Sequence, residues 1–168
     1  IDADRIARDI NLNGKSISFI QYDVLDSEKS IFIEKASKYK FTHLYYFVTP
    51  HIFSGENGFF SERVFESFIK FYVIEFFKIV DCLVDFGLKK ILYPSTTAID
   101  EVPLNMGEYM TAKSAGELVC KFLEKKYPSL EISKPRISRM ATDQTVNIFP
   151  VNNVHPSNVV LDLVRKIN

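Results

Sequence analysis

The feature that most constrains the fold is a regular alternation of short apolar segments with longer segments of helical periodicity. The short segments are rich in β-branched and aromatic residues and predict four strands, at residues 16–23, 42–48, 89–95 and 130–136. The longer segments predict helices at about residues 26–39, 61–85 and 107–126, with a last helix opened by Pro156. Strands joined by helices form right-handed βαβ units, so the sequence predicts an α/β protein with a mostly parallel sheet.

The most apolar stretch, residues 64–93, does not have the pattern of a membrane span. Charged residues interrupt it at short intervals, namely Glu66, Lys70, Glu75, Lys78, Asp81 and Asp85. Its apolar residues recur every three or four positions, which predicts a helix with one broad buried face and no membrane partner. The first residues are acidic and lack the apolar run of a secretory signal, so we expect a cytoplasmic protein.

Composition excludes several other classes of protein. The 168 residues include 21 Lys and Arg against 21 Asp and Glu, so the chain lacks the surplus of cations that nucleic-acid binding draws on. Cys82 and Cys120 lie far apart and are predicted to be reduced thiols. His43, His51 and His155 are dispersed, and we assign none of them to a metal site.

The candidate chemistry lies where the predicted strands end. In an open parallel sheet, ligands bind at the carboxyl ends of the strands. The residues found there are Asp23, Thr49, Ser95, Thr96, Pro135 and Arg136. Tyr109 and Lys113, four residues apart near the start of the helix at 107–126, share one helix face. A chain of this composition is expected to contain about one such pair by chance, so the spacing alone is weak evidence. The pair is a candidate site because Tyr109 follows the hydroxyl of Thr96, at a predicted strand end, by 13 residues.

With these features the chain resembles the short-chain dehydrogenase/reductase superfamily, and in particular its extended, epimerase-like branch. The resemblance rests on Tyr109-x-x-x-Lys113, on the hydroxyl residues that follow Lys-Lys-Ile-Leu-Tyr-Pro, on Asp23-Val24 after one strand and on Pro135-Arg136 after another. It covers roughly residues 1–150. It implies a Rossmann-type fold, NAD or NADP as cofactor, and a small-molecule substrate with a hydroxyl or carbonyl carbon.

The resemblance also implies a role for each candidate residue. Tyr109 would be the general acid or base, and Lys113 would lower its pKa and hold the cofactor ribose. Thr96 would bind the substrate oxygen, with Ser95 as the alternative hydroxyl. The remaining cofactor-binding candidates are Asp23 and Val24 near the adenine, Thr49 at a strand end, and Pro135 and Arg136 towards the nicotinamide. A phenol has an ordinary pKa near 10, so a neighbouring cation is needed to favour the phenolate.

The sequence departs from the family at its beginning. It has six glycines, and it lacks the strand, glycine-rich turn and helix that hold the cofactor pyrophosphate in these enzymes. The close pair Gly55 and Gly58 follows the wrong strand and is predicted to be an ordinary loop. A further departure is Tyr72, at a helix position where the family often has an active-site Asn.

We therefore expect residues 1–168 to form a single, incomplete Rossmann-type domain, the C-terminal two-thirds of a longer one. It would have three layers, with about four strands and helices on both faces. The gap left by the missing strands would be closed by a longer chain, by direct pairing of its neighbours, or by another chain.

Two functions remain open from the sequence. The first is an NAD(P)-dependent oxidoreductase or epimerase that uses Thr96, Tyr109 and Lys113. The second is a non-catalytic Rossmann-like module that binds or oligomerises through the Phe-rich helix at residues 61–85. We expect a homo-oligomer, in particular a homodimer, or association with a missing N-terminal segment. The sequence leaves the substrate, and the choice between NAD and NADP, undetermined.

Overall fold

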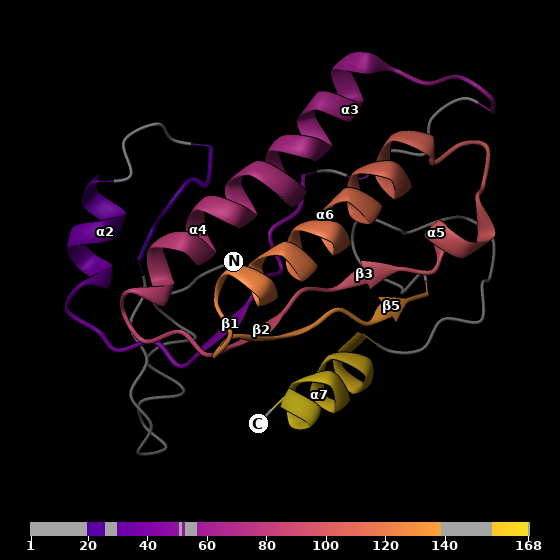
Figure 1. Cartoon of the computed structure of the whole chain (residues 1–168). Coiled ribbons are helices and arrows are strands. Elements are labelled where there is room, and N and C mark those ends of the chain that lie inside the picture. Colours follow the sequence, from indigo (N-terminus) through magenta and orange to yellow (C-terminus); the bar gives the residue numbers. More distant parts are fainter. Residues whose placement is uncertain (1–19, 26–29, 51, 53–56, 139–155, 168) are drawn as a thin grey trace. The chain divides into compact units, whose positions relative to one another are not determined.

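The computed structural model describes residues 20–25, 30–50, 52, 57–138 and 156–167 (Figure 1). The chain divides into two compact units, Ile1–Tyr39 and Lys40–Asn168. In the first unit, helix α2 covers Ser30–Ala36, and the rings of Tyr22 and Phe32 stack with their centroids 4.4 Å apart. Most of the strand predicted at residues 16–23 lies outside the described residues, and residues 20–23 are not in a strand.

The second unit contains a parallel sheet. Strand β1 covers His43–Tyr45, β2 covers Lys90–Leu92 and β4 covers Glu131–Ser133, in the order β1-β2-β4. A second parallel ladder joins β3, Ser95–Thr96, to β5, Arg136–Ile137. Ile91 of β2 pairs with Leu44 on one side and Ile132 on the other. The predicted α/β class and the parallel sheet are confirmed, with three of the four predicted strands among the described residues.

Two prolines explain why the sheet is divided into two ladders. Pro94 lies between β2 and β3, and Pro135 lies between β4 and β5. The pairs Leu92 with Ser133 and Ser95 with Arg136 flank these prolines, so the two prolines stand at matched positions. Proline has no amide hydrogen to donate, so the bonds that alternate residues of β4 donate to β2 stop at Pro135, while Pro94 lacks a donor on the side of β1. Pairing then resumes, because the Ser95 amide donates to the Pro135 carbonyl at 2.8 Å.

The long helix predicted at residues 61–85 is present, with a change of winding in the middle. It consists of α3, Glu62–Ile69, a π-helical segment η1, Lys70–Glu75, and α4, Phe76–Val84. The Ser61 side chain caps its start, and Gly87, with φ of 94°, follows its end. Within η1 the carbonyls of Phe71 and Tyr72 accept hydrogen bonds from the hydroxyls of Tyr46 and Tyr93, at 2.7 and 3.0 Å.

The remaining helices complete the layers around the sheet. Helix α5 covers Ala98–Glu101, α6 covers Gly107–Lys126 and α7 covers Pro156–Ile167. In Figure 1, α6 and the α3–α4 helix lie together on one face of the strands, and α7 lies on the other. The expected three layers, with helices on both faces, are therefore present. The core between the sheet and the helices is apolar and aromatic, with Tyr72, Phe76, Ile91 and Tyr93 fully buried.

Candidate functional site

Thr96, Tyr109 and Lys113 come together where the central strand ends. Thr96 closes β3, and the other two lie one turn apart near the start of α6. Thr96 and Lys113 are only 8% and 7% exposed, and the Thr96 side chain lies near enough to Tyr109 to influence its pKa. The spacing predicted from the sequence therefore corresponds to a real juxtaposition of a hydroxyl, a phenol and an amine in a buried place.

A small residue lets α6 approach the sheet closely enough to form this site. Lys113, Gly116 and Cys120 recur at steps of three and four residues and are buried along one face of α6. A Cβ atom built on Gly116 would lie 1.9 Å from the Tyr93 hydroxyl oxygen. The position therefore excludes any side chain, because the tyrosine after β2 occupies the space.

Lys113 is held by a backbone carbonyl and two aromatic rings. Its Nζ donates to the Pro94 carbonyl at 2.7 Å and lies 3.9 Å from the ring centroid of Tyr72 and 4.9 Å from that of Tyr93. Among the residues that the structure describes, no carboxylate forms an ion pair with it. Burial lowers the pKa of Lys113 to about 7, so the amine changes charge near neutral pH.

Tyr109 differs from its expected electrostatics. Its ring packs edge-on against Phe68 and Tyr72, with centroids 5.7 and 5.8 Å away. Burial raises the pKa of Tyr109, and the Thr96 side chain opposes that rise. The resemblance implied a lowered pKa through Lys113. The direction is reversed in this chain because the cost of burying a phenolate dominates, while the Lys113 amine faces the ring of Tyr72.

Tyr72 and Thr49 form a contact that sequence reasoning missed. The Tyr72 hydroxyl and Thr49 Oγ1 are 2.5 Å apart, and Tyr72 is fully buried with a pKa raised mainly by that burial. Thr49, a cofactor candidate, follows β1 and also donates to the Pro50 carbonyl at 3.0 Å. The sequence shows a tyrosine in the long helix and a threonine at a strand end. It does not show that they meet, because Tyr72 lies in the π-helical segment, which was not predicted.

Ser95 and Arg136 belong to a separate polar network. The Ser95 hydroxyl donates to Glu117 at 2.6 Å, and the Arg136 guanidinium forms two hydrogen bonds with the same carboxylate, at 2.8 and 2.9 Å, and a further one with Asp100. Arg136 lowers the pKa of Glu117. Both candidates are thus engaged with protein groups, which favours Thr96 over Ser95 as the hydroxyl beside Tyr109. Pro135, also a candidate, is half-buried, and its carbonyl accepts the Ser95 amide hydrogen of the β3–β5 ladder.

The adenine candidates lie in the first unit. Asp23 is exposed, and its carboxylate accepts the amide hydrogen of Leu25 at 2.9 Å in a local turn, while Val24 is buried. Their part in cofactor binding stays a prediction.

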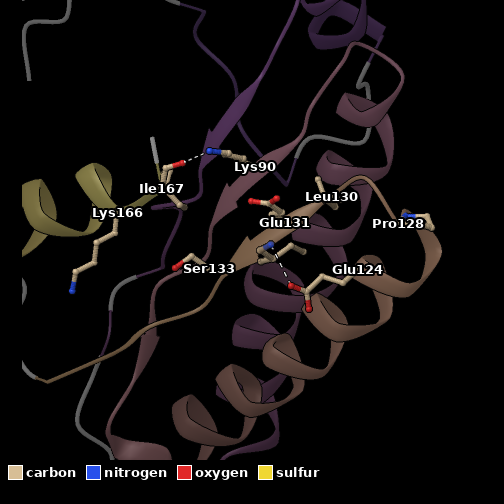
Figure 2. Close-up of a pocket in the computed structure, with 9 residues that line it drawn as sticks. Lys90, Glu124, Pro128, Leu130, Glu131, Ser133, Lys166 and Ile167 are labelled. Atoms are coloured by element: carbon tan, nitrogen blue, oxygen red, sulfur yellow. Dashed lines mark hydrogen bonds between the residues drawn. The ribbon is translucent and has the colours of Figure 1, made fainter.

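A hollow of about 550 Å³ lies elsewhere in the second unit, beside β4 (Figure 2). Figure 2 shows Lys90 donating to the Ile167 carbonyl, at 2.8 Å, and Glu124 of α6 accepting the Ile132 amide hydrogen, at 3.2 Å. Thr96, Tyr109 and Lys113 do not line it. This hollow and the candidate catalytic residues are therefore distinct, and we define the functional site by its side chains.

Within the described part of the chain, no group of three or more His, Cys, Asp and Glu side chains is arranged to hold a metal ion. None of the helices described there combines the length and the apolar character needed to cross a membrane.

Comparison with known proteins relates this fold to one group of enzymes. No protein-family model matches the sequence, and no curated protein matches it significantly. Among solved structures, it resembles a short-chain dehydrogenase from Salmonella enterica serovar Typhi, with 16% identity and a TM-score of 0.78 over 95% of this chain and 72% of that one. An alcohol dehydrogenase from Thermococcus sibiricus, in complex with 5-hydroxy-NADP, gives 15% identity and a TM-score of 0.79 over 98% and 75%.

A third structure binds a related cofactor. Alternative dihydrofolate reductase 1 from Brucella suis, in complex with NADP, has 12% identity and a TM-score of 0.71, and the match covers 86% of this chain and 61% of that protein. The protein thus has the fold of the short-chain dehydrogenases, and the resemblance inferred from the sequence is confirmed at the level of the fold. The extended branch is not distinguished by these matches.

Proposed function

We propose that the protein is an NAD(P)-dependent oxidoreductase of the short-chain dehydrogenase/reductase type, acting on a hydroxyl or carbonyl carbon of a small molecule. The observation that supports it most is the cluster of Thr96, Tyr109 and Lys113 at the carboxyl end of a parallel sheet, where such folds bind their ligands. The similar solved structures include complexes with NADP and 5-hydroxy-NADP, which supports the same class of cofactor.

The chain's own residues divide the work of the reaction. A nicotinamide dinucleotide, when bound, supplies or accepts the hydride. In the direction of reduction, the Tyr109 hydroxyl donates its proton to the carbonyl oxygen as hydride reaches the carbon, and Thr96 orients that oxygen by a hydrogen bond. In oxidation the tyrosinate accepts the alcohol proton. Lys113, when protonated, stabilises the tyrosinate and offers hydrogen bonds to the cofactor ribose.

The residues fit one half of such a cofactor. Lys113 is a buried amine without a carboxylate partner among the described residues, so its hydrogens remain available to a hydroxyl-bearing ligand. The sequence has no glycine-rich turn for the pyrophosphate, and we assign that group to no residue of this chain. Oxidation and reduction are the two directions of one hydride transfer, and epimerisation through a ketone uses both directions in turn, so the site suits each of these reactions.

Binding is tested with the chain and either NADPH or NADH at millimolar concentration. We expect a rise in the melting temperature with at least one of the two dinucleotides, because a ligand that binds only the folded state stabilises it. The absence of a shift with both would overturn cofactor binding by this chain.

Catalysis is tested by following nicotinamide absorbance with a panel of aldehydes, ketones and alcohols. Tyr109→Phe keeps the ring and removes the proton donor, so we expect turnover to fall by roughly 10²–10⁴-fold. Tyr39→Phe, at an exposed tyrosine in the first unit, is the matched control and should keep full activity. Full activity in Tyr109→Phe would remove Tyr109 from the proposed catalytic role, and the absence of turnover by the parent protein with the whole panel would support the non-catalytic module.

We also propose that the protein forms a homodimer through the outer faces of the long helix and α6. Leu118 and Phe122 are 63% and 56% exposed on α6, and Phe77 lies beside Phe122 with its ring centroid 6.2 Å away. An exposed apolar face of this kind is typical of an interface between subunits. A cytoplasmic location remains the expectation from the sequence.

A further inference from the structure

The aromatic surface beneath Lys113 is the part of the site with no assigned role. The amine lies 3.9 Å from the ring centroid of Tyr72, closer than to Tyr93 at 4.9 Å, and Tyr72 has no exposed surface. A cation this near to an aromatic face is attracted by the ring quadrupole, and the attraction strengthens when water is excluded. A neutral amine has no comparable attraction.

The Tyr72 ring is fixed from several sides. Its hydroxyl is bonded to Thr49, which follows β1, and its backbone carbonyl accepts the Tyr93 hydroxyl, which follows β2. Phe68 stacks on the same ring, with centroids 5.8 Å apart and planes 11° from parallel. The π-helical segment η1 carries Tyr72, and such segments occur frequently at functional sites.

The tyrosines and the thiol around Lys113 are neutral near pH 7. Tyr72 from η1, Tyr93 after β2, and Tyr109 and Cys120 on α6 all have pKa values raised by burial, that of Cys120 to about 12. Strand β3 contributes hydroxyls alone, and the carboxylates Asp100 of α5 and Glu117 of α6 are paired with Arg136.

We propose that Tyr72 is a positioning residue, whose ring face holds the protonated Lys113 amine under Tyr109 while the Thr49 hydroxyl fixes the orientation of the ring. This inference rests on the proposed function, in which Lys113 acts beside Tyr109. The aromatic face favours the charged form of Lys113 and so opposes the effect of its burial. The contact with Thr49 links the Tyr72 ring, on which the Lys113 amine lies, to the end of β1.

The test follows the protonation of Lys113 directly, by carbon NMR of the full chain labelled in its lysine side chains. Lys113→Met identifies the signal by its loss. In Tyr72→Met, which fills much of the space without a ring, we expect the Lys113 midpoint to fall by roughly 0.5 to 1 pH unit. Tyr72→Phe keeps the ring face and should lower the midpoint by clearly less than Tyr72→Met does. An equal midpoint in both variants, or a rise in Tyr72→Met from water entering the space, overturns the proposal.

A second pair of variants decides the matter if Tyr72→Met fails to fold. Tyr72→Phe and Thr49→Val each remove one partner of the same hydrogen bond. We expect equal small downward shifts in the two single variants and no further shift in the double variant. Additive shifts, or none in either variant, would show that the hydroxyl pair does not fix the ring.

The titration requires neither cofactor nor turnover, so it is separable from the proposed function. If the parent protein shows no cofactor-dependent turnover while the Lys113 midpoint moves as expected, the oxidoreductase proposal fails and the proposed role of Tyr72 stands. If Tyr109→Phe is inactive and the midpoint does not move, the reverse holds.

Discussion

At the scale of single residues, the site is dominated by burial. Lys113 and Tyr109 are both shifted towards their neutral forms, because the surrounding aromatic rings replace water. The sequence predicted which residues meet, since helical spacing and strand order fix their positions. It did not predict the direction of the Tyr109 pKa, because desolvation depends on the packing of Phe68 and Tyr72 around the hydroxyl.

Lys113 should make the stability of the protein depend on pH. Its pKa falls from 10.5 to about 7 on folding, so between these values the unfolded chain binds more protons and stability rises with pH. The slope is about 1 kcal/mol per pH unit for one proton. Urea unfolding from pH 7 to 8 should show this rise, and Lys113→Met should abolish it. At higher pH the buried thiol and phenols, whose pKa values are raised, oppose the rise.

The exposed Lys121→Met is the control for this prediction and should keep the parental slope. An unchanged slope in Lys113→Met would show that the Lys113 amine is not the group responsible.

Gly116→Ala should destabilise the protein by about 1–3 kcal/mol, because the new methyl group meets the Tyr93 hydroxyl. Thermal or urea unfolding measures the loss. Gly107→Ala is the matched control, since its nearest neighbour is the exposed ring of Phe60 at 3.2 Å, which can move. Adding Tyr93→Phe to Gly116→Ala should cost less than the sum of the two single changes, and strict additivity would contradict the clash.

At the scale of elements, helices were the more predictable part of the molecule. The helix predicted at 107–126 is observed as Gly107–Lys126, and the long helix begins and ends within a residue of its prediction, because Ser61, Gly87 and Pro128 are local signals. The π-helical turn was not predicted, because it depends on hydroxyls from Tyr46 and Tyr93, which are distant in sequence. The continuous strands predicted at 89–95 and 130–136 are interrupted for a local reason, their prolines.

The Arg136 network should join α6 to the end of the sheet. Arg136→Met removes its bonds to Glu117 and Asp100, and we expect a small loss of stability at neutral pH, because the pair is partly exposed. The Glu117 pKa is lowered on folding, so its share of stability is present above pH 4.5 and is lost as the pH falls further. Urea unfolding at neutral pH and again well below pH 4.5 should therefore show a smaller effect of the substitution in acid.

Arg165→Met, in an exposed pair with Asp162 at 3.7 Å, provides the control for this prediction and should change stability little. A loss in Arg136→Met that is equal at both pH values would assign the effect to packing instead of charge.

At the scale of the whole molecule, the site residues Thr96, Tyr109 and Lys113 belong to the second unit, while Asp23 and Val24 belong to the first. The three solved relatives described above are longer, with 61 to 75% of their lengths matched by this chain. The oligomeric state can be tested separately from the site, because the outward faces of the long helix and α6 do not contribute to it.

Phe122→Glu should convert the proposed homodimer into a monomer, because it places a charge in an apolar interface. Light scattering after size-exclusion chromatography measures the mass. Leu161→Glu, at a position 51% exposed on α7, is the control and should leave the mass unchanged. If the parent protein is already monomeric at micromolar concentration, the proposed homodimer is wrong.

The matched prolines of the sheet have a consequence for how a cation can be held. Pro94 offers Lys113 a neutral carbonyl oxygen, at the place where the ladder is interrupted. A carboxylate in that position would keep the amine charged across the physiological range. A backbone dipole orients the amine without a full opposing charge, so Lys113 can gain or lose its proton near pH 7. The Pro94 carbonyl thus accepts a hydrogen bond from Lys113 without fixing the charge of its amine.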